Sequence, residues 1–318
     1  MRLPHRNILP AIAVTALALG TAGCSWFSKD SPYELPADAR PLEVPPDLDL
    51  PDTSAYVSRE WRWRIGAIDN DHGLPLQRQF RAMLQSQLRD GGKDYAQVNI
   101  NAAGYDDRLL RGNGILRTPP NFNAFYERNW SREGNWELYG NLGVNNGGIG
   151  GERGLGYNLQ FRPTYYVSDA FNVFVVGSAE STPHWTVWQH DNLLGSFDER
   201  ALEIDAGVNW TIGDRQELRV KLQAIGLDAR LRQAWRVAAD GTPVPVDEPV
   251  DDFGLRNLGF QVRYRYQLAP LSDLYVVYGR GGYMLEAFGR DEASQLMHAF
   301  ALRDSEQLLV KLSYRFEL

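Results

Sequence analysis

Apolar and polar residues alternate one by one along much of the chain. In the last eleven residues, Leu308 to Leu318, one set of positions holds Leu, Val, Tyr and Phe and the other holds mostly charged residues. Successive side chains of a strand point to opposite faces of its sheet, so this pattern predicts a strand with one apolar and one polar face. The same pattern predicts strands in residues 61–65, 136–144, 155–162, 202–212, 217–224 and 258–268.

The segment from Leu76 to Arg89 fits two structures. Its residues alternate as in a strand, but its apolar residues also share one face of a helix, with Pro75 before the segment and Gly91 after it. The neighbouring strand patterns favour a strand, and the helix is the open alternative.

The lengths of the runs and of their connections predict the fold class. Many runs reach about ten residues, the length that a tilted strand needs to cross a bilayer, whereas soluble strands average about half of that. Short connections are predicted at 90–95, 131–135, 163–169, 213–216 and 269–273, and longer ones at 103–121, 145–152, 181–196, 228–256 and 279–305. Short turns on one rim and long loops on the other are typical of outer-membrane barrels. Residues 58–318 are therefore predicted to form an all-β, antiparallel transmembrane β-barrel of about twelve strands, with its N-terminus in the periplasm.

One turn offers a local check of this prediction. Trp210 and Val220 must share the outer face, which requires an odd number of residues in the turn between their strands, and 213–215 supplies three. A secreted β-sandwich or a lipid-carrier barrel with its apolar face inward uses the same alternation. It accounts less well for the long strands and the many aromatic residues.

Composition excludes two other classes of protein. The chain is 43% hydrophobic with a mean hydropathy of −0.39. Beyond the N-terminus it has no apolar run of about 18 residues, which excludes a bundle of membrane-spanning helices. The formal charge of −7 provides no basic footprint, so no nucleic-acid partner is predicted.

The N-terminus is predicted to be a signal peptide over residues 1–23. Arg2 and Arg6 precede an apolar stretch that is too short to span a membrane. The tetrapeptide Thr21-Ala22-Gly23-Cys24 resembles a bacterial lipobox, although Thr21 departs from the usual leucine. The resemblance implies lipid attachment at Cys24 and membrane lipid as a partner. An ordinary cleaved signal beside an unused thiol is the alternative.

Residues 24–57 are predicted to be a disordered, proline-rich tether. They show no periodicity, and prolines are spaced among acidic and small residues. The run Leu42-Glu43-Val44-Pro45-Pro46-Asp47-Leu48 is similar to the start of BamC, a lipoprotein of the outer-membrane assembly machinery. The resemblance covers about residues 20–57 and implies that the tether binds this machinery. The partner-binding residues that it implies are Tyr33, Leu42, Val44, Pro45, Pro46 and Leu48.

The remainder carries a second resemblance. Residues 60–318 resemble the C-terminal barrel, of unknown function, in large outer-membrane proteins that carry a family-9 carbohydrate-binding-like domain. The stretches that match are 105–112, 117–119, 222–235, 264–282 and 311–316. The binding domain and the earlier strands are missing, so ligand recognition is not carried over. Because an open sheet edge cannot face lipid, the strands must close on themselves or form a larger barrel with other copies of the chain. A gene fusion that never folds stably is the third possibility.

Candidate catalytic and metal-binding residues are few. His184 and His190 share a predicted loop and could bind a metal, but solvated loop histidines fit their spacing better. The acidic residues of 247–252 lack the spacing of a calcium loop. The glycines of 147–151 do not form a dinucleotide fingerprint. No enzymatic activity and no cofactor are predicted.

The polar faces of the predicted strands carry charges of both signs. These side chains can pair across the lumen and partly plug it, or they can line a narrow channel. The predicted role is therefore structural or passive uptake of small solutes, and a BamC-like accessory of the assembly machinery is the alternative. The predicted lumen-facing residues are Arg81, Arg162, Glu203, Asp205, Arg219, Lys221, Arg263, Arg265 and Arg315.

Overall fold

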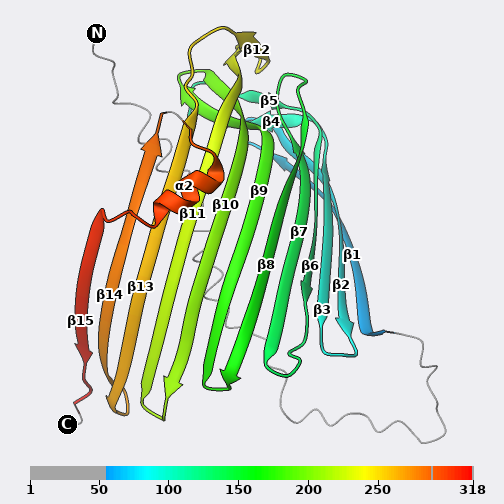
Figure 1. The fold of residues 1–318 in the computed structure, drawn as a ribbon. Helices are drawn as coiled ribbons and strands as arrows, with labels where there is room; N and C mark the ends of the chain where they lie inside the picture. Colours follow the sequence, from blue (N-terminus) through cyan, green and yellow to red (C-terminus); the bar gives the residue numbers. More distant parts are fainter. Residues whose placement is uncertain (1–54, 288, 317–318) are drawn as a thin grey trace, which may run out of the picture.

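One long antiparallel sheet makes up most of the molecule. The computed structural model describes residues 55–287 and 289–316. Twelve strands follow one another across the sheet in chain order, as the sequence predicts (Figure 1). They are β1 (Tyr56–Asp69), β2 (Pro75–Leu88), β3 (Lys93–Asn101), β6 (Asn121–Asn129), β7 (Trp136–Gly147), β8 (Gly154–Ser168), β9 (Phe171–His190), β10 (Leu193–Ile212), β11 (Gln216–Val237), β13 (Phe253–Ala269), β14 (Ser272–Glu286) and β15 (Ser305–Ser313).

The remaining elements lie near the upper end of the sheet in Figure 1. The short strand β12 (Pro243–Val246) pairs with the end of β11, and β4 (Gly104–Asp106) pairs with β5 (Leu116–Thr118) in a separate hairpin. The only helix of the described residues is α2 (Glu292–Ala299). No helix in 55–287 or 289–316 is long and apolar enough to cross a membrane.

One rim carries only short turns, and the other carries the longer connections together with the two-residue turn between β9 and β10 (Figure 1). The turn between β10 and β11 has the three predicted residues, 213–215, and Gly213 adopts a φ of 59° there. The resulting register pairs Trp210 with Leu218 and Val208 with Val220, so all four side chains share a face. The segment with two possible structures is the strand β2, and its helical alternative is wrong.

The predicted long loops 181–196, 228–256 and 279–305 and the predicted short connection 163–169 are wrong in extent, since β8 runs to Ser168 and β14 to Glu286. Residues 181–196 continue β9 and begin β10 around a two-residue turn, and β11 extends through residue 237. The pairing of β10 with β9 shifts register between Phe197 and Glu199, opposite Pro183 and His184, and His184 adopts a φ of 57°. An irregularity of this kind interrupts the alternation of side chains, which explains why the sequence pattern ends before the strands do.

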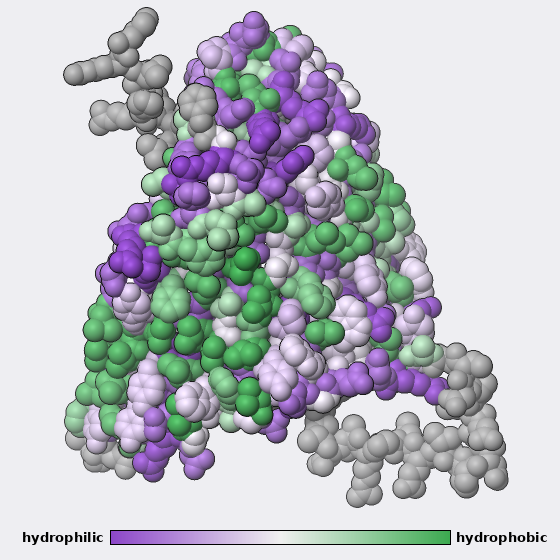
Figure 2. All heavy atoms as spheres, viewed as in Figure 1, coloured by the Kyte–Doolittle hydropathy of each residue, from purple (hydrophilic) through white to green (hydrophobic). Residues whose placement is uncertain are grey.

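The sheet has an apolar and a polar face. The apolar face carries Leu202, Ile204, Ala206, Val208 and Trp210 of β10 together with the residues that pair with them. Many of its side chains are exposed, as Ile65 at 76%, Phe161 at 50% and Val310 at 61% illustrate, while Leu202, Ile204, Ala206 and Val208 in the middle of the sheet are half-buried. We call the stretch Leu202–Ile212 and its counterparts on neighbouring strands the apolar band. Figure 2 shows apolar side chains gathered over the strands below α2 and a mainly hydrophilic upper end.

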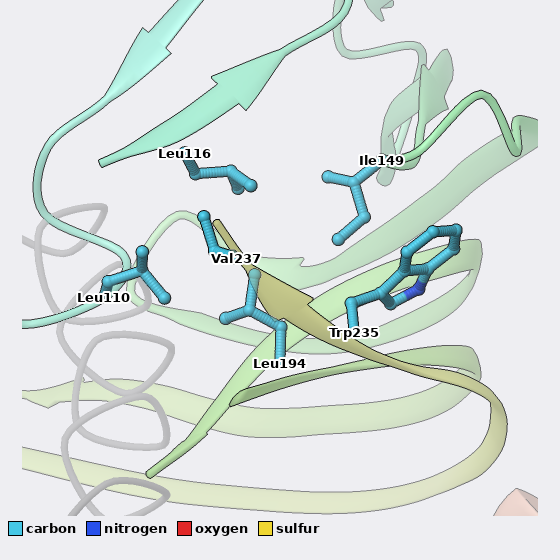
Figure 3. Packing of buried hydrophobic residues seen from close by; sticks show 6 residues of the cluster. All are labelled: Leu110, Leu116, Ile149, Leu194, Trp235 and Val237. Atoms are coloured by element: carbon cyan, nitrogen blue, oxygen red, sulfur yellow. The ribbon is translucent and has the colours of Figure 1, made fainter. Parts of the chain in front are cut away.

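The buried core lies at the upper end of the sheet. Leu110 and Leu116, from the connection between β3 and β6, pack against Leu194, Trp235 and Val237 at the tips of β10 and β11 (Figure 3). A second cluster lies next to it along the same strands. Its buried members are Phe197, Leu227, Ala229, Phe253 and Leu255. These contacts tie an early connection to late strands, so they hold the upper end of the sheet together.

The helix α2 packs on the apolar face near its upper edge. Asp291 caps the helix by accepting a hydrogen bond from the Ser294 backbone N–H at 2.7 Å. Leu296 and Ala299 pack against Ala224 and Leu258 in a third buried cluster. At Gly226, an added Cβ would lie 2.2 Å from the Leu296 backbone nitrogen, so only glycine permits this approach.

Candidate functional site

Side-chain hydrogen bonds connect neighbouring strands on the polar face of the sheet. Arg81 donates to the Asn99 amide oxygen at 2.7 Å, and Asn99 in turn donates to Asn123. Asn158 donates to Asn141 at 3.1 Å farther along the sheet. These bonds connect β2 with β3 and β6, and β7 with β8. The amide and charged side chains of the polar face therefore form a hydrogen-bond network.

The predicted lumen-facing residues share this polar face, with one exception. The residues on it are Arg81, Arg162, Glu203, Asp205, Arg219, Lys221, Arg263 and Arg265. Arg315 follows the end of β15, where its backbone N–H donates to the Ser272 hydroxyl at 3.0 Å. Whether this face lines a lumen stays a prediction.

The charges on the polar face pair with neighbours in the sheet. Arg265 pairs with Asp273 at 3.0 Å on the next strand, and Gln223 donates to Glu203 at 2.6 Å. Arg263 lies over the ring of Tyr275, 5.4 Å from its centroid. These contacts run along the sheet between neighbouring strands, and pairing across a lumen stays a prediction.

A cavity of about 350 Å³ opens on the polar face, at the border between the hydrogen-bond network and the buried core. Three carboxylates line it, Glu180 of β9 and Glu199 and Glu203 of β10. Amide and hydroxyl side chains make up most of the rest of its polar lining, and these are Asn141, Asn158, Gln160, Ser178 and Gln223. We call this space the acidic cavity.

Glu199 is the most buried of the three carboxylates. It is 6% exposed, and its Oε2 atom has no hydrogen-bond partner among the described residues. It lies three residues beyond Leu202, above the apolar band. Burial raises the pKa of Glu199 to about 7, and the negative charge of Glu180 adds to this effect, while hydrogen bonds from Thr182 oppose it.

This pKa predicts a pH-dependent stability that Glu199→Gln removes. A raised pKa means that protonated Glu199 stabilises the fold fully below pH 4.5 and that this contribution is lost as the pH rises through about 7. Relative to the variant, the wild type is expected to lose on the order of 3 kcal/mol of unfolding free energy from about pH 5 to pH 8. Urea unfolding in detergent micelles at both pH values measures this. If the unfolding free energies of the two proteins change equally with pH, the ionisation of Glu199 does not destabilise the fold.

Sequence reasoning missed Glu180 and Glu199. Glu180 directly precedes the wrongly predicted loop 181–196, and Glu199 follows it, so neither could be assigned to a face of a strand. The acidic residues of the cavity come together only because β9 and β10 pair through this stretch, with Glu180 opposite Ala201. No local sequence signal locates them, because above the apolar band Val187 and Phe197 pack on the opposite face, with Leu227 and Ala229.

A second cavity of about 530 Å³ lies on the same face, nearer to β15. Glycines form part of its lining on β13 and β14, at Gly259, Gly279 and Gly281. Asp205 supplies a negative charge to the lining, and Lys221 and Arg280 supply positive charges. This cavity therefore has no excess of negative charge, unlike the acidic cavity.

The candidate metal ligands are apart from one another. His184 lies on β9 near Glu152, with 3.3 Å between its Nδ1 and the Glu152 Oε2, while His190 lies at the end of the strand beside Asp191. In the acidic loop, Glu248 forms an ion pair with Arg236 at 2.6 Å. Within residues 55–287 and 289–316, no three His, Cys, Asp or Glu side chains are placed to hold a metal ion.

The candidate sites of the N-terminal segment lie outside the described residues. They are Cys24 and the leader residues Tyr33, Leu42, Val44, Pro45, Pro46 and Leu48. The predicted tether, residues 24–57, overlaps β1 by two residues, because β1 begins at Tyr56. Lipid attachment and binding by the leader stay predictions.

Comparison with known proteins gives a distant structural likeness. No family model matches the chain, and no curated protein matches it. Among solved structures, the chain is similar to the copper transporter OprC, with 13% sequence identity and a TM-score of 0.45. The likeness covers 81% of this chain but 42% of the transporter, so the chain spans less than half of that protein's length.

Proposed function

We propose that the chain is an outer-membrane β-barrel protein with a structural role or a role in the passive uptake of small solutes. The observation that carries this proposal is the exposed apolar band on strands of membrane-spanning length. The stretch Leu202–Ile212 has eleven residues. At about 3.3 Å per residue and a tilt of about 45°, it rises by about 26 Å, which matches the height of about 25 Å typical of the apolar band of such barrels.

Aromatic and charged residues mark the two limits of the band. Near the rim of short turns, Trp136 contacts Tyr165 with 4.8 Å between ring centroids, and Phe171 contacts Trp210 at 5.7 Å. Aromatic girdles of this kind occur where a barrel meets the lipid headgroups. Beyond Leu202 the same face becomes charged, and Asp228 pairs there with Arg230 at 2.9 Å. The band therefore has the limits expected of a surface that contacts a bilayer.

A water-soluble barrel or sandwich fits these observations less well. It needs the apolar face to be covered, because removing apolar surface from water is its main source of stability. Along β8 the face instead carries Leu155, Tyr157, Leu159 and Phe161 with at least 45% of each side chain exposed. Of the described elements that pack on this face, α2 covers only its upper edge.

Membrane insertion also requires that the two edge strands be paired. Strands β1 and β15 form the edges of the sheet, and no pairing joins them among the described residues. Each unpaired backbone group in lipid costs several kcal/mol. Because the strand number on the path is even, β1 and β15 run in opposite directions and can form an antiparallel pair, within one chain or between two copies.

Cysteine pairs test this closure. In a Cys24→Ser background, one cysteine replaces an apolar-face residue of β1, from Trp61, Trp63 and Ile65, and the other replaces Val310 or Leu312 of β15. At least one pair is expected to form a disulfide in the membrane fraction, and the mass of the product tells one chain from two. If every pair stays reduced under oxidising conditions, the edges do not meet.

The proposed function is tested by the behaviour of the membrane fraction. A folded barrel should migrate anomalously on a gel unless it is boiled in detergent, and vesicles that contain it should swell in small neutral solutes if it admits them. A folded barrel without swelling indicates the structural role. The proposal is contradicted if the protein migrates identically with and without boiling and does not float with membranes in a density gradient.

The leader carries a second candidate function, that of an accessory of the assembly machinery. Its support is the sequence Leu42-Glu43-Val44-Pro45-Pro46-Asp47-Leu48, which resembles the start of BamC. A pull-down with residues 25–54 deleted separates the two candidates. Loss of assembly-machinery partners on deletion supports the accessory role, and unchanged partners exclude it.

A further inference from the structure

The acidic cavity differs from the rest of the polar face in its charge. Its lining contains Glu180, Glu199 and Glu203, and among the described residues that line it there is no Lys and no Arg. Elsewhere on this face a carboxylate has a basic partner on the neighbouring strand, as Asp273 has in Arg265. The cavity is therefore a local excess of negative charge that the chain itself does not neutralise.

One oxygen of the Glu199 carboxyl group lacks a partner inside the cavity among the described residues, although Thr182 hydrogen-bonds to this carboxyl group. The carboxyl group lines the cavity, the residue is 6% exposed, and the oxygen without a partner among the described residues is Oε2. Buried carboxylates in proteins are normally paired with a cation or fully hydrogen-bonded, because an unpaired buried charge is costly. A bound cation would supply this pairing, with Glu180 and Glu203 close enough to add to the attraction.

The remaining lining selects the kind of cation. Carboxylates placed to surround a metal ion are not found in the described residues. The cavity instead offers amides on Asn141, Asn158, Gln160 and Gln223, which accept and donate hydrogen bonds to hydroxyl groups. Apolar lining from Ile225 and Leu227 suits a carbon skeleton, and about 350 Å³ falls within the range of small-molecule sites.

We propose that the acidic cavity binds a small organic cation, a primary ammonium compound that carries hydroxyl groups, with Glu199 holding the ammonium group. This inference rests on the proposed function, because it assigns a solute class to the polar face of the barrel. The amides of β7, β8 and β11 hold the hydroxyl groups, and the buried core above the cavity limits the length of the solute.

The test compares glucamine with sorbitol, which share a polyhydroxylated chain and differ in the ammonium group. Binding to the full chain in detergent micelles at about pH 8 is measured by titration calorimetry. Glucamine is expected to bind at least tenfold more tightly than sorbitol. Glu199→Gln is expected to abolish this preference, and Glu180→Gln to reduce it. Glu217→Gln, a carboxylate change on the same face at the far end of β11, should leave it intact.

Several results would overturn the inference. They are equal binding of the two probes, no binding of either, or a Glu199→Gln variant that retains the preference. If magnesium ions compete with glucamine and the competition is lost in Glu199→Gln, the cavity binds a metal ion and not an organic cation. Anomalous gel migration and vesicle swelling in sorbitol are measured on the same preparations. If anomalous migration and swelling persist while glucamine is not preferred over sorbitol, the inference fails and the proposed function stands. If migration and swelling are lost while glucamine still binds, the proposed function fails and the cavity still binds the cation.

Discussion

Replacing Val175 with arginine is expected to lower the free energy of unfolding by about 2–4 kcal/mol and to deplete the folded protein from the membrane fraction. Val175 lies on the apolar face of β9, 51% of it is exposed, and it pairs with Ala206 near the middle of the apolar band. An arginine at this depth places a charge in hydrocarbon. Urea unfolding in lipid vesicles, followed by gel migration without boiling, measures the loss.

The matched control is Gln261→Arg. Gln261 is exposed on the polar face of β13, where it pairs with Lys221. Arginine there stays in water, so the expected change is below about 1 kcal/mol, as for substitutions that face the lumen of a barrel. If both arginines have equal effects, or if only Gln261→Arg destabilises the protein, the apolar face does not contact lipid.

Replacing Phe197 with alanine is expected to cost about 3–5 kcal/mol of unfolding free energy. The side chain is fully buried at 0% exposure, and its ring meets that of Phe253 edge to face with 5.2 Å between centroids. Truncation leaves a cavity where β10, β11 and β13 meet above the apolar band. Guanidinium unfolding in micelles measures the loss.

Phe197→Leu serves as the companion variant, because it keeps most of the apolar volume. It should cost less than half as much as the alanine variant. Limited proteolysis should also cut Phe197→Ala first within the upper connections, such as residues 238–252. A loss below about 1 kcal/mol for Phe197→Ala would show that the upper core does not stabilise the sheet.

The alternation of apolar and polar residues predicts the strands correctly wherever one face of the sheet is apolar along the whole segment. Residues 202–212 and 217–224 keep a strict alternation, and the structure has strands there with Trp210 and Val220 on the same face, as predicted. The turn at 213–215 follows from the same parity. This works because the apolar face is decided locally, by which side chains point to it.

The pattern failed where long-range packing decides which face is apolar. Above the apolar band, Leu227 and Phe197 point into a core that includes Phe253, while Asp228 and Arg230 occupy the other face. The irregularity opposite Pro183 adds a shift that no local pattern reveals. The sequence could not show this inversion, because it depends on contacts between distant strands.

The helix α2 was missed for a related reason. Its eight residues lie within the predicted loop 279–305, and the helix buries only Gln295, Leu296 and Ala299. A helix this short gains most of its stability from packing, which Gly226 makes possible by allowing close approach. The cap at Asp291 was the available signal, although caps alone do not distinguish helices from turns.

The central claim is that the apolar face contacts lipid and the polar face contacts water, and spin labels along β8 test it most directly. In a Cys24→Ser background, single cysteines at residues 158 to 162 carry the label in reconstituted vesicles. The account predicts that Leu159 and Phe161, the counterparts of Leu202 and Ile204, are accessible to oxygen dissolved in the bilayer and that Asn158, Gln160 and Arg162 are accessible to a water-soluble nickel complex. The opposite assignment, or no difference between the two sets, would contradict it.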